Sequence, residues 1–123
     1  MTSNLLAATD FSAPARHAVE RAALIARSCP DARLTLAHVL QASLFDRLRL
    51  LTVDESSELE ARIRQDAQRQ LDEAARNLGA RFGIAIESTV ESGTPLEILP
   101  RLLTGHDASL LVMGTRGAHF VCE

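Results

Sequence analysis

Tryptophan and tyrosine are absent from this 123-residue sequence, and phenylalanine occurs only four times. The core must therefore consist of aliphatic side chains, which supply nearly all of a 46% hydrophobic fraction. Charged residues make up 24% of the chain, which is ordinary for a soluble globular protein. Length and composition together predict a single domain over residues 1–123.

Cysteine is also scarce, since Cys29 and Cys122 are the only two. Two cysteines make neither a disulfide framework nor a metal site, and we expect both to be reduced thiols. The four histidines lack the spacing of metal ligands, and the sequence contains no GxSxG motif. We interpret His17 as a surface residue and His38 as a hydrogen-bonded strand residue. Nothing in the sequence argues for an enzyme.

Long hydrophobic runs and basic clusters are missing too. No apolar stretch approaches the roughly 20 residues of a membrane span, and the start lacks the features of a signal peptide. The formal net charge is −3, and no run of lysine or arginine occurs. A mildly acidic chain gives no electrostatic reason to expect DNA or RNA binding. We therefore expect a cytoplasmic protein that binds neither membranes nor nucleic acids.

Short apolar runs alternate along the chain with stretches of helical periodicity. This alternation predicts an α/β fold with a doubly wound, open, mostly parallel sheet, helices on both faces and right-handed crossovers. The third run alternates in polarity, as a strand near a sheet edge does. Residues 41–57 suggest only a loop with a helical turn. The four expected strands are 4–8, 33–40, 84–93 and 109–113.

Local signals mark the ends of the expected helices. Ser12 is a good N-cap for the first helix, with Pro14 in its first turn. Thr94 begins a TPLE capping box, and Gly79 is a plausible stop for a long helix over residues 55–78. The first helix should bury one stripe made of Ala18, Val19, Ala22, Ala23 and Ala26.

Two strand ends carry residues suited to a ligand. Thr9 and Asp10 follow the first strand, and the sequence from Gly114 to Gly117 follows the fourth. In open α/β sheets, ligands bind beyond the carboxyl ends of strands where the strand order reverses. A carboxylate can accept hydrogen bonds from ribose hydroxyls, glycines let backbone N–H groups approach phosphates, and Arg116 can add charge-assisted hydrogen bonds. These residues suit a nucleotide if the two strands are neighbours.

The same residues also have purely structural interpretations. An aspartate before a capped helix often stabilises only a turn, and two glycines after a strand commonly form one. The sequence contains neither a GxxxxGK[ST] phosphate loop nor the dinucleotide motif GxGxxG. From the residues alone, nucleotide binding and plain turn formation both stay open.

Four segments resemble those of the universal stress protein family, and the resemblance spans essentially the whole chain. They are NLLAATDFS, LTLAHVL, ESGTPLEIL and ASLLVMGTRG. The resemblance implies a Rossmann-like sheet with strand order 3-2-1-4-5, in which the first and fourth strands are neighbours. The family's fifth strand commonly makes the dimer contact, so the resemblance also implies a homodimer or a higher oligomer.

ATP-binding members of this family carry a glycine pattern that begins like Gly114 and Gly117. The resemblance then implies an adenine-nucleotide site for ATP, alone or with Mg²⁺. Asp10 would contact ribose or a phosphate-bound metal, and Val39 would meet the adenine. The remaining implied contacts are Ala8 and Thr9 beside Asp10, and Met113, Gly114, Arg116 and Gly117 along the ribose and phosphates.

The chain departs from the family pattern at its end. Only six residues follow Gly117, so the second half of the phosphate motif, the final helix and the fifth strand are missing. We therefore expect the fourth strand to be an exposed apolar edge. The leading hypothesis is an ATP-binding stress-response regulator that acts through ligand-dependent association. The alternatives are a non-nucleotide-binding interaction module of the same family and a small nucleotide-hydrolysing α/β enzyme.

Overall fold

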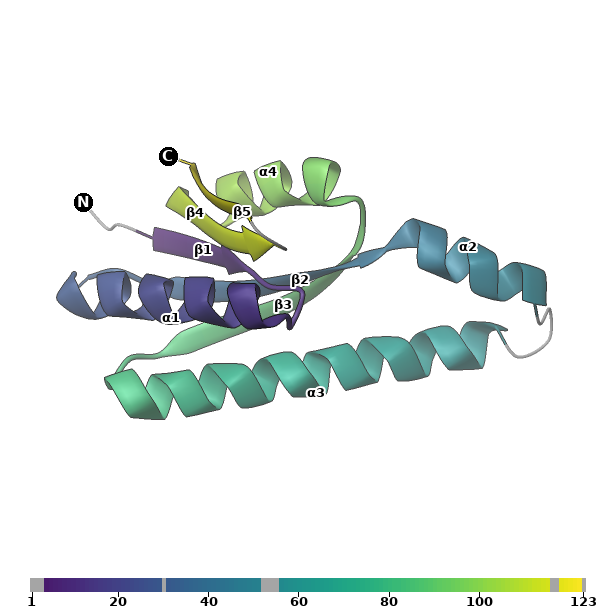
Figure 1. Ribbon diagram of the computed structural model, residues 1–123, viewed down its shortest axis with the longest axis horizontal. Helices are drawn as coiled ribbons and strands as arrows, with labels where there is room; N and C mark the ends of the chain where they lie inside the picture. Colours follow the sequence, from purple (N-terminus) through teal and green to yellow (C-terminus); the bar gives the residue numbers. More distant parts are fainter. Residues whose placement is uncertain (1–3, 30, 52–55, 116–117, 123) are drawn as a thin grey trace.

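The computed structural model describes residues 4–29, 31–51, 56–115 and 118–122, and these residues form one five-stranded sheet with four helices (Figure 1). The predicted site residues Arg116 and Gly117 therefore lie outside the described residues. The elements in chain order are β1 (Asn4–Ala8), α1 (Ala13–Ser28), β2 (Leu34–Gln41), α2 (Ala42–Leu51), α3 (Ser56–Phe82), β3 (Ile86–Gly93), α4 (Pro95–Gly105), β4 (Ala108–Thr115) and β5 (Ala118–Cys122).

The sheet has the strand order β3-β2-β1-β4-β5. The first four strands are mutually parallel, which confirms the predicted α/β class and the order 3-2-1-4. Helices α1 and α3 cover one face, and α4 covers the other (Figure 1). Neighbours β1 and β4 place their carboxyl ends side by side, with Ala8 paired to Met113.

The prediction that the chain lacks a fifth strand and leaves β4 as an open edge is wrong. Strand β5 pairs antiparallel with β4, from Leu111 opposite Cys122 to Thr115 opposite Ala118. Only two residues separate the strands, which is the spacing of a tight β-hairpin. Residues 118–122 follow two glycines that resemble the start of a phosphate motif, so no strand was predicted there.

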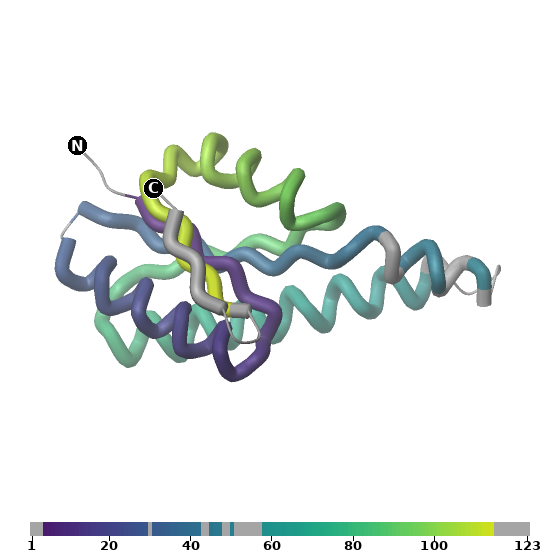
Figure 2. The backbone as a smooth tube through the Cα atoms, turned by 45° about the horizontal axis from the view of Figure 1, so that its top comes forward, coloured from purple at the N-terminus to yellow at the C-terminus, as the bar shows by residue number. Residues whose placement is uncertain are grey.

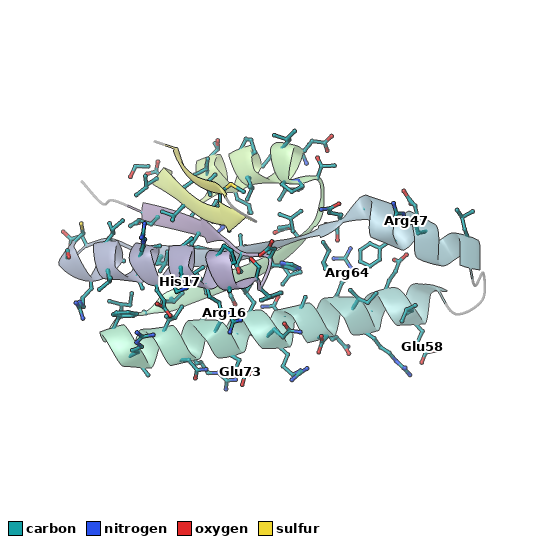
Figure 3. All side chains as sticks on the ribbon, viewed as in Figure 1. Arg16, His17, Arg47, Glu58, Arg64 and Glu73 are labelled. Atoms are coloured by element: carbon teal, nitrogen blue, oxygen red, sulfur yellow. The ribbon has the colours of Figure 1, made fainter. Side chains whose placement is uncertain are left out.

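The stretch expected to be a loop is largely the helix α2. Figure 2 shows α2 and the first turns of α3 extending together past the carboxyl end of β2. Phe45 is buried there beside Leu40 and Ala67. The Arg64 guanidinium lies 5.5 Å from the centroid of the Phe45 ring, and Figure 3 shows Arg64 between the two helices.

Most of the predicted helix signals correspond to real ends. The Ser12 hydroxyl accepts a hydrogen bond from the Ala15 N–H and caps α1 as predicted. Helix α3 continues past Gly79 to Phe82, so the predicted stop is wrong. Gly83 ends the helix instead, at φ 69°, and the Ile84 N–H closes the end by donating to the Gly79 carbonyl at 3.0 Å. Thr94 precedes α4, but its side chain makes no capping hydrogen bond.

Two aliphatic layers form the core, one on each face of the sheet. The predicted α1 stripe is buried, and it packs with Leu34, Leu36 and Leu71 on the face under α1 and α3. Leu6, Ala37, Leu99 and Leu111 form the layer under α4. Consecutive residues of β1 alternate between these layers, as the pleat of a strand requires. A sheet covered on both faces leaves its strand ends as the place for a site.

Candidate functional site

A pocket of about 170 Å³ lies at the carboxyl ends of β1, β2 and β4, against the first turn of α4. It is at the point where the strand order reverses, because β1 leads to β2 on one side and has β4 on the other. Six of the eight predicted site residues line this pocket, and the other two are outside the described residues. The lining consists of Ala8, Thr9, Asp10, His38, Val39, Gln41, Pro95, Leu99, Met113 and Gly114.

The turn from β1 to α1 is held by its own side chains. The Thr9 hydroxyl accepts a hydrogen bond from the Phe11 N–H at 3.0 Å, and Asp10 Oδ1 accepts one from the Ser12 N–H at 2.9 Å. Phe11 has a φ of 66°, which a bulky side chain rarely adopts. Asp10 therefore has the structural role considered above, as well as a place in the pocket.

Asp10 is exposed at the pocket mouth, and it stays ionised to lower pH than an ordinary aspartate. Partial burial raises its pKa, but the hydrogen bonds from Ser12 outweigh that effect and hold the pKa below 3.8. The nearby His38 ring adds a smaller contribution in the same direction. The pocket therefore presents one carboxylate that accepts hydrogen bonds near neutral pH.

His38 was predicted only as a hydrogen-bonded strand residue, but it also lines the pocket. Its Nδ1 lies 2.8 Å from the Thr9 carbonyl oxygen, so this nitrogen carries the proton and donates. The ring also packs against Phe11, with centroids 4.5 Å apart. These contacts join the end of β2 to the turn that holds Asp10. Their signal in the sequence was weak, because the partners are 29 residues apart.

Close packing against α1, without any ligand, requires a glycine at position 114. A Cβ at this position would lie 2.5 Å from the Pro14 carbonyl oxygen and 3.1 Å from the Ala18 Cβ. The first turn of α1 therefore packs directly on β4. In the sheet, Gly114 pairs with His119 of β5. The predicted phosphate contact and this packing role fall on the same residue.

The rest of the described chain holds no candidate metal centre. No group of three or more histidine, cysteine, aspartate or glutamate side chains able to hold a metal occurs among the described residues. His17 is exposed on α1, as predicted (Figure 3). Cys29 is a free thiol, also as predicted. Within the described residues, none of the helices combines the length and apolar character needed to cross a membrane.

Comparison with known proteins gives one consistent family. The sequence profile of the universal stress protein family matches residues 1–121. A solved structure from that family in Burkholderia pseudomallei is 28% identical, with a TM-score of 0.72 over 94% of this chain and 83% of that chain. No individually curated protein matches the chain.

Two further solved structures show the same fold at lower identity. A universal stress protein from Lactobacillus plantarum is 24% identical, with a TM-score of 0.67 over 95% of this chain and 81% of that one. A universal stress protein solved in complex with cAMP is 24% identical, with a TM-score of 0.63 over 94% of this chain and 74% of that one.

Proposed function

Because this chain belongs to the universal stress protein family, we propose that it is a stress-response regulator that binds an adenine nucleotide, with ATP as the leading candidate. The observation that carries the proposal is the single pocket that collects the six described site residues at the switch point of the sheet. The similar protein that was solved with cAMP supports a nucleotide as the class of ligand.

The pocket suits the base of a nucleotide better than the whole molecule. Its volume of about 170 Å³ is below the roughly 300–1,000 Å³ of sites that enclose an entire ligand. Val39, Leu99 and Met113 give it apolar walls that can sandwich a flat ring. Asp10 lies at the mouth, where a carboxylate can accept hydrogen bonds from ribose hydroxyls. The base would sit inside and the ribose at the rim.

The phosphates would then follow the segment from Gly114 toward Gly117, where Arg116 supplies the positive charge. ATP bound here would supply three phosphate groups and a place for Mg²⁺. That metal usually takes one or two protein carboxylates together with phosphate oxygens, and Asp10 is the carboxylate within the pocket. This chain's own residues would bind and orient the nucleotide.

We infer that the protein acts through nucleotide-dependent association with itself or with other proteins rather than through turnover. A homodimer or higher oligomer is part of this proposal, as is a cytoplasmic location. Sedimentation of the chain with and without ATP and Mg²⁺ tests the association step. A sedimentation coefficient that nucleotide leaves unchanged would contradict nucleotide-dependent self-association.

Isothermal titration calorimetry of the whole chain tests nucleotide binding directly. Adenosine, cAMP and ATP with Mg²⁺ are the three titrants, so that the contribution of the phosphates separates from that of the nucleoside. Val39→Arg should abolish binding, because the new side chain would fill the pocket that accommodates the base. The control is His17→Arg, a charge-adding change on the exposed face of α1. Absence of saturable heat with all three titrants would refute the proposal.

A second candidate is a family member that binds no nucleotide and works as an interaction module. The pairing of Gly114 with His119 favours it, because this ladder engages the segment proposed for the phosphates. Denaturing the purified protein and analysing the supernatant by mass spectrometry separates the two candidates. A stoichiometric adenine nucleotide released in this way would rule out the second.

A further inference from the structure

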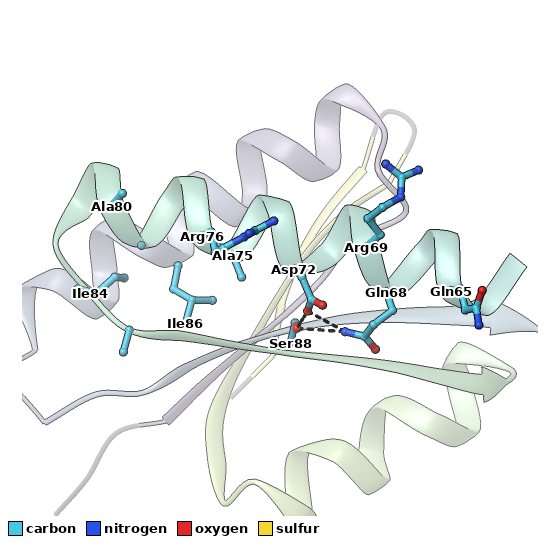
Figure 4. Close-up of a pocket in the computed structure, with 12 residues that line it drawn as sticks. Gln65, Gln68, Arg69, Asp72, Ala75, Arg76, Ala80, Ile84, Ile86 and Ser88 are labelled. Atoms are coloured by element: carbon cyan, nitrogen blue, oxygen red, sulfur yellow. Dashed lines mark hydrogen bonds between the residues drawn. The ribbon is translucent and has the colours of Figure 1, made fainter. Parts of the chain in front are cut away.

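A groove of about 870 Å³ lies beside the sheet edge, between α3 and β3 (Figure 4). Strand β3 lies at the end of the strand order and pairs with β2 alone among the described strands. Its other side therefore offers free backbone N–H and carbonyl groups. The groove runs along this edge, at a distance from the pocket proposed for nucleotides.

Small side chains produce the hollow. Ala75, Gly79 and Ala80 of α3 line it, together with Ala85 before β3. Gly79 has no room for a side chain, since a Cβ there would lie 2.8 Å from the Ile84 carbonyl oxygen. The end of α3 is thus in close contact with the chain entering β3, and this contact closes one end of the groove. The small side chains leave the space above them unfilled.

A polar cluster fixes the middle of the groove. The Ser88 hydroxyl donates to Asp72, and the Gln68 amide donates to both, at 2.8 Å to Asp72 and 3.3 Å to Ser88 (Figure 4). Hydrogen bonds from Ser88 and Gln68 lower the pKa of Asp72 below its usual value. These bonds hold β3 against α3, so the edge is preorganised for a further strand.

The two faces of β3 differ sharply in chemistry. Ile86, Ser88 and Val90 point toward α3, where Ile86 and Val90 pack on the core. Strand alternation turns Glu87 and Glu91 toward the opposite face, and Glu87 is exposed. The strand carries no basic residue. The edge therefore combines two carboxylates on one face with a groove on the other, whose small floor residues are rimmed by Arg69, Arg76 and the Asp72 cluster.

We propose that the β3 edge binds an extended segment of another protein in which small apolar residues alternate with basic ones. The segment would add as a sixth strand beside β3. Its apolar side chains would enter the groove over Ala80 and Ile84, and its basic side chains would face Glu87 and Glu91. Main-chain hydrogen bonds give such strand addition its affinity, and alternate side chains give it specificity.

A second copy of this chain fits this edge poorly. Two β3 strands pairing about a two-fold axis would bring four carboxylates to one face, and opposed like charges destabilise cross-strand pairs. The chain is also acidic overall, with a net charge of −3. Charge complementarity therefore favours basic side chains on the face of Glu87 and Glu91, whereas Arg69 and Arg76 disfavour them in the groove, where small apolar side chains fit.

Fluorescence anisotropy with a labelled peptide tests the proposal on the whole chain. The probe alternates lysine and valine over seven residues, and the control peptide has the same composition with its lysines and valines in separate blocks. We expect saturable binding of the alternating probe and weaker binding of the control. Because strand addition uses every second N–H, N-methylation of one alternate set should abolish binding, while methylation of the other set should not.

Protein variants locate the site. Glu87→Lys should weaken binding of the probe roughly threefold to tenfold at low salt, since it replaces attraction by repulsion at an exposed position. Ala80→Gln should weaken it by filling the groove. Glu73→Lys is the matched control, because Glu73 is exposed on α3 and lies outside this groove. Amide NMR shifts on adding probe should concentrate between residues 84 and 91.

Several results would overturn the proposal. One is the absence of saturable binding, which would leave the carboxylates a purely protective role. Equal binding of the two peptides, or an equal loss with Glu73→Lys and Glu87→Lys, would show nonspecific attraction to an acidic protein. Self-association without any probe, with amide shifts confined to residues 84–91, would assign the edge to a second copy. Nucleotide titrations do not depend on this edge, so their outcome leaves the proposal unaffected.

Discussion

The substitution Gly114→Ala tests whether close packing, rather than a ligand, requires a glycine at the end of β4. The added Cβ would lie 2.5 Å from the Pro14 carbonyl oxygen, 2.9 Å from the Pro14 carbonyl carbon and 3.1 Å from the Ala18 Cβ. The two nearest atoms belong to backbone, which cannot rotate aside. Either α1 shifts away from the sheet or the β4 backbone moves, and both disturb the buried layer around Ala18 and Val112.

The expected loss follows from the size of this overlap. Overpacking costs about 1–3 kcal/mol, and contact with rigid backbone places Gly114→Ala at the upper end. Alanine restricts the unfolded chain more than glycine does, which returns about 0.5–1 kcal/mol. We therefore expect the free energy of unfolding to fall by about 2 kcal/mol, and the Tm by roughly 6–10 °C.

Urea denaturation followed by far-UV circular dichroism is the appropriate assay, because the chain has no tryptophan or tyrosine to report by fluorescence. Gly105→Ala is the matched control, since a Cβ at Gly105 meets nothing within 4 Å. The control should change stability by less than about 0.5 kcal/mol. Equal stability of the two variants would refute the packing argument. Loss of nucleotide binding in a fully stable Gly114→Ala protein would assign the glycine to the ligand.

Three further substitutions test other parts of the structure. Leu71→Ala removes a fully buried side chain and should lower the free energy of unfolding by about 2–5 kcal/mol in the same assay. Leu59→Ala, on the more exposed part of α3, should lower it far less. Similar losses for the two variants would contradict the assigned core. Gly83→Ala should lower the free energy of unfolding by about 1 kcal/mol through the φ of 69° alone, because a Cβ there meets no atom within 4 Å. An unchanged urea midpoint would contradict the assigned helix end. Partial burial raises the pKa of Asp10, but hydrogen bonds from Ser12 outweigh this effect and hold the pKa below 3.8. The Asp10 carboxylate therefore stabilises the fold fully above about pH 4. Its contribution is lost as the pH falls through the folded-state pKa. Asp10→Asn should flatten that acid limb in urea titrations between about pH 5 and 2, and an unchanged limb would refute the role of the turn.

Much of the fold could be predicted because short-range physics decides it. Ser12 and Pro14 mark the start of α1 through preferences that act within one turn, and the alanine stripe of α1 reports its buried face by periodicity alone. The alternation of strands and helices then restricts the sheet to a parallel arrangement. The strand order itself came from the resemblance, and it was confirmed for the four parallel strands.

The remainder depends on contacts between residues far apart in the chain. Gly114 and Pro14 are 100 residues apart in the sequence, and His38 is 29 residues from Thr9, whose carbonyl it contacts. No local sequence pattern therefore predicts either contact. Gly79 lies inside α3 because the helix end is set one turn later, where Gly83 adopts a left-handed conformation. Helix α2 has no capping signal that distinguishes it from a loop, and burial of Phe45 against Leu40 and Ala67 ties it to α3 and the end of β2.

The β4–β5 hairpin and a phosphate-binding loop would use the same residues. The hairpin should therefore affect the binding of the phosphates and leave the binding of the nucleoside unchanged. Gly114 and Thr115 pair with His119 and Ala118, so a ligand that needs the backbone of this segment must bind molecules in which the pairing has changed. Its apparent affinity is then reduced by the fraction of molecules in that state. Adenosine needs only the pocket formed by residues such as Val39 and Met113, and it bears no such cost. An ATP affinity close to that of adenosine would therefore mean that the phosphates gain nothing from this segment while the hairpin is closed. An affinity far above that of adenosine, together with amide NMR shifts along residues 118–122, would mean that nucleotide binding rearranges β5.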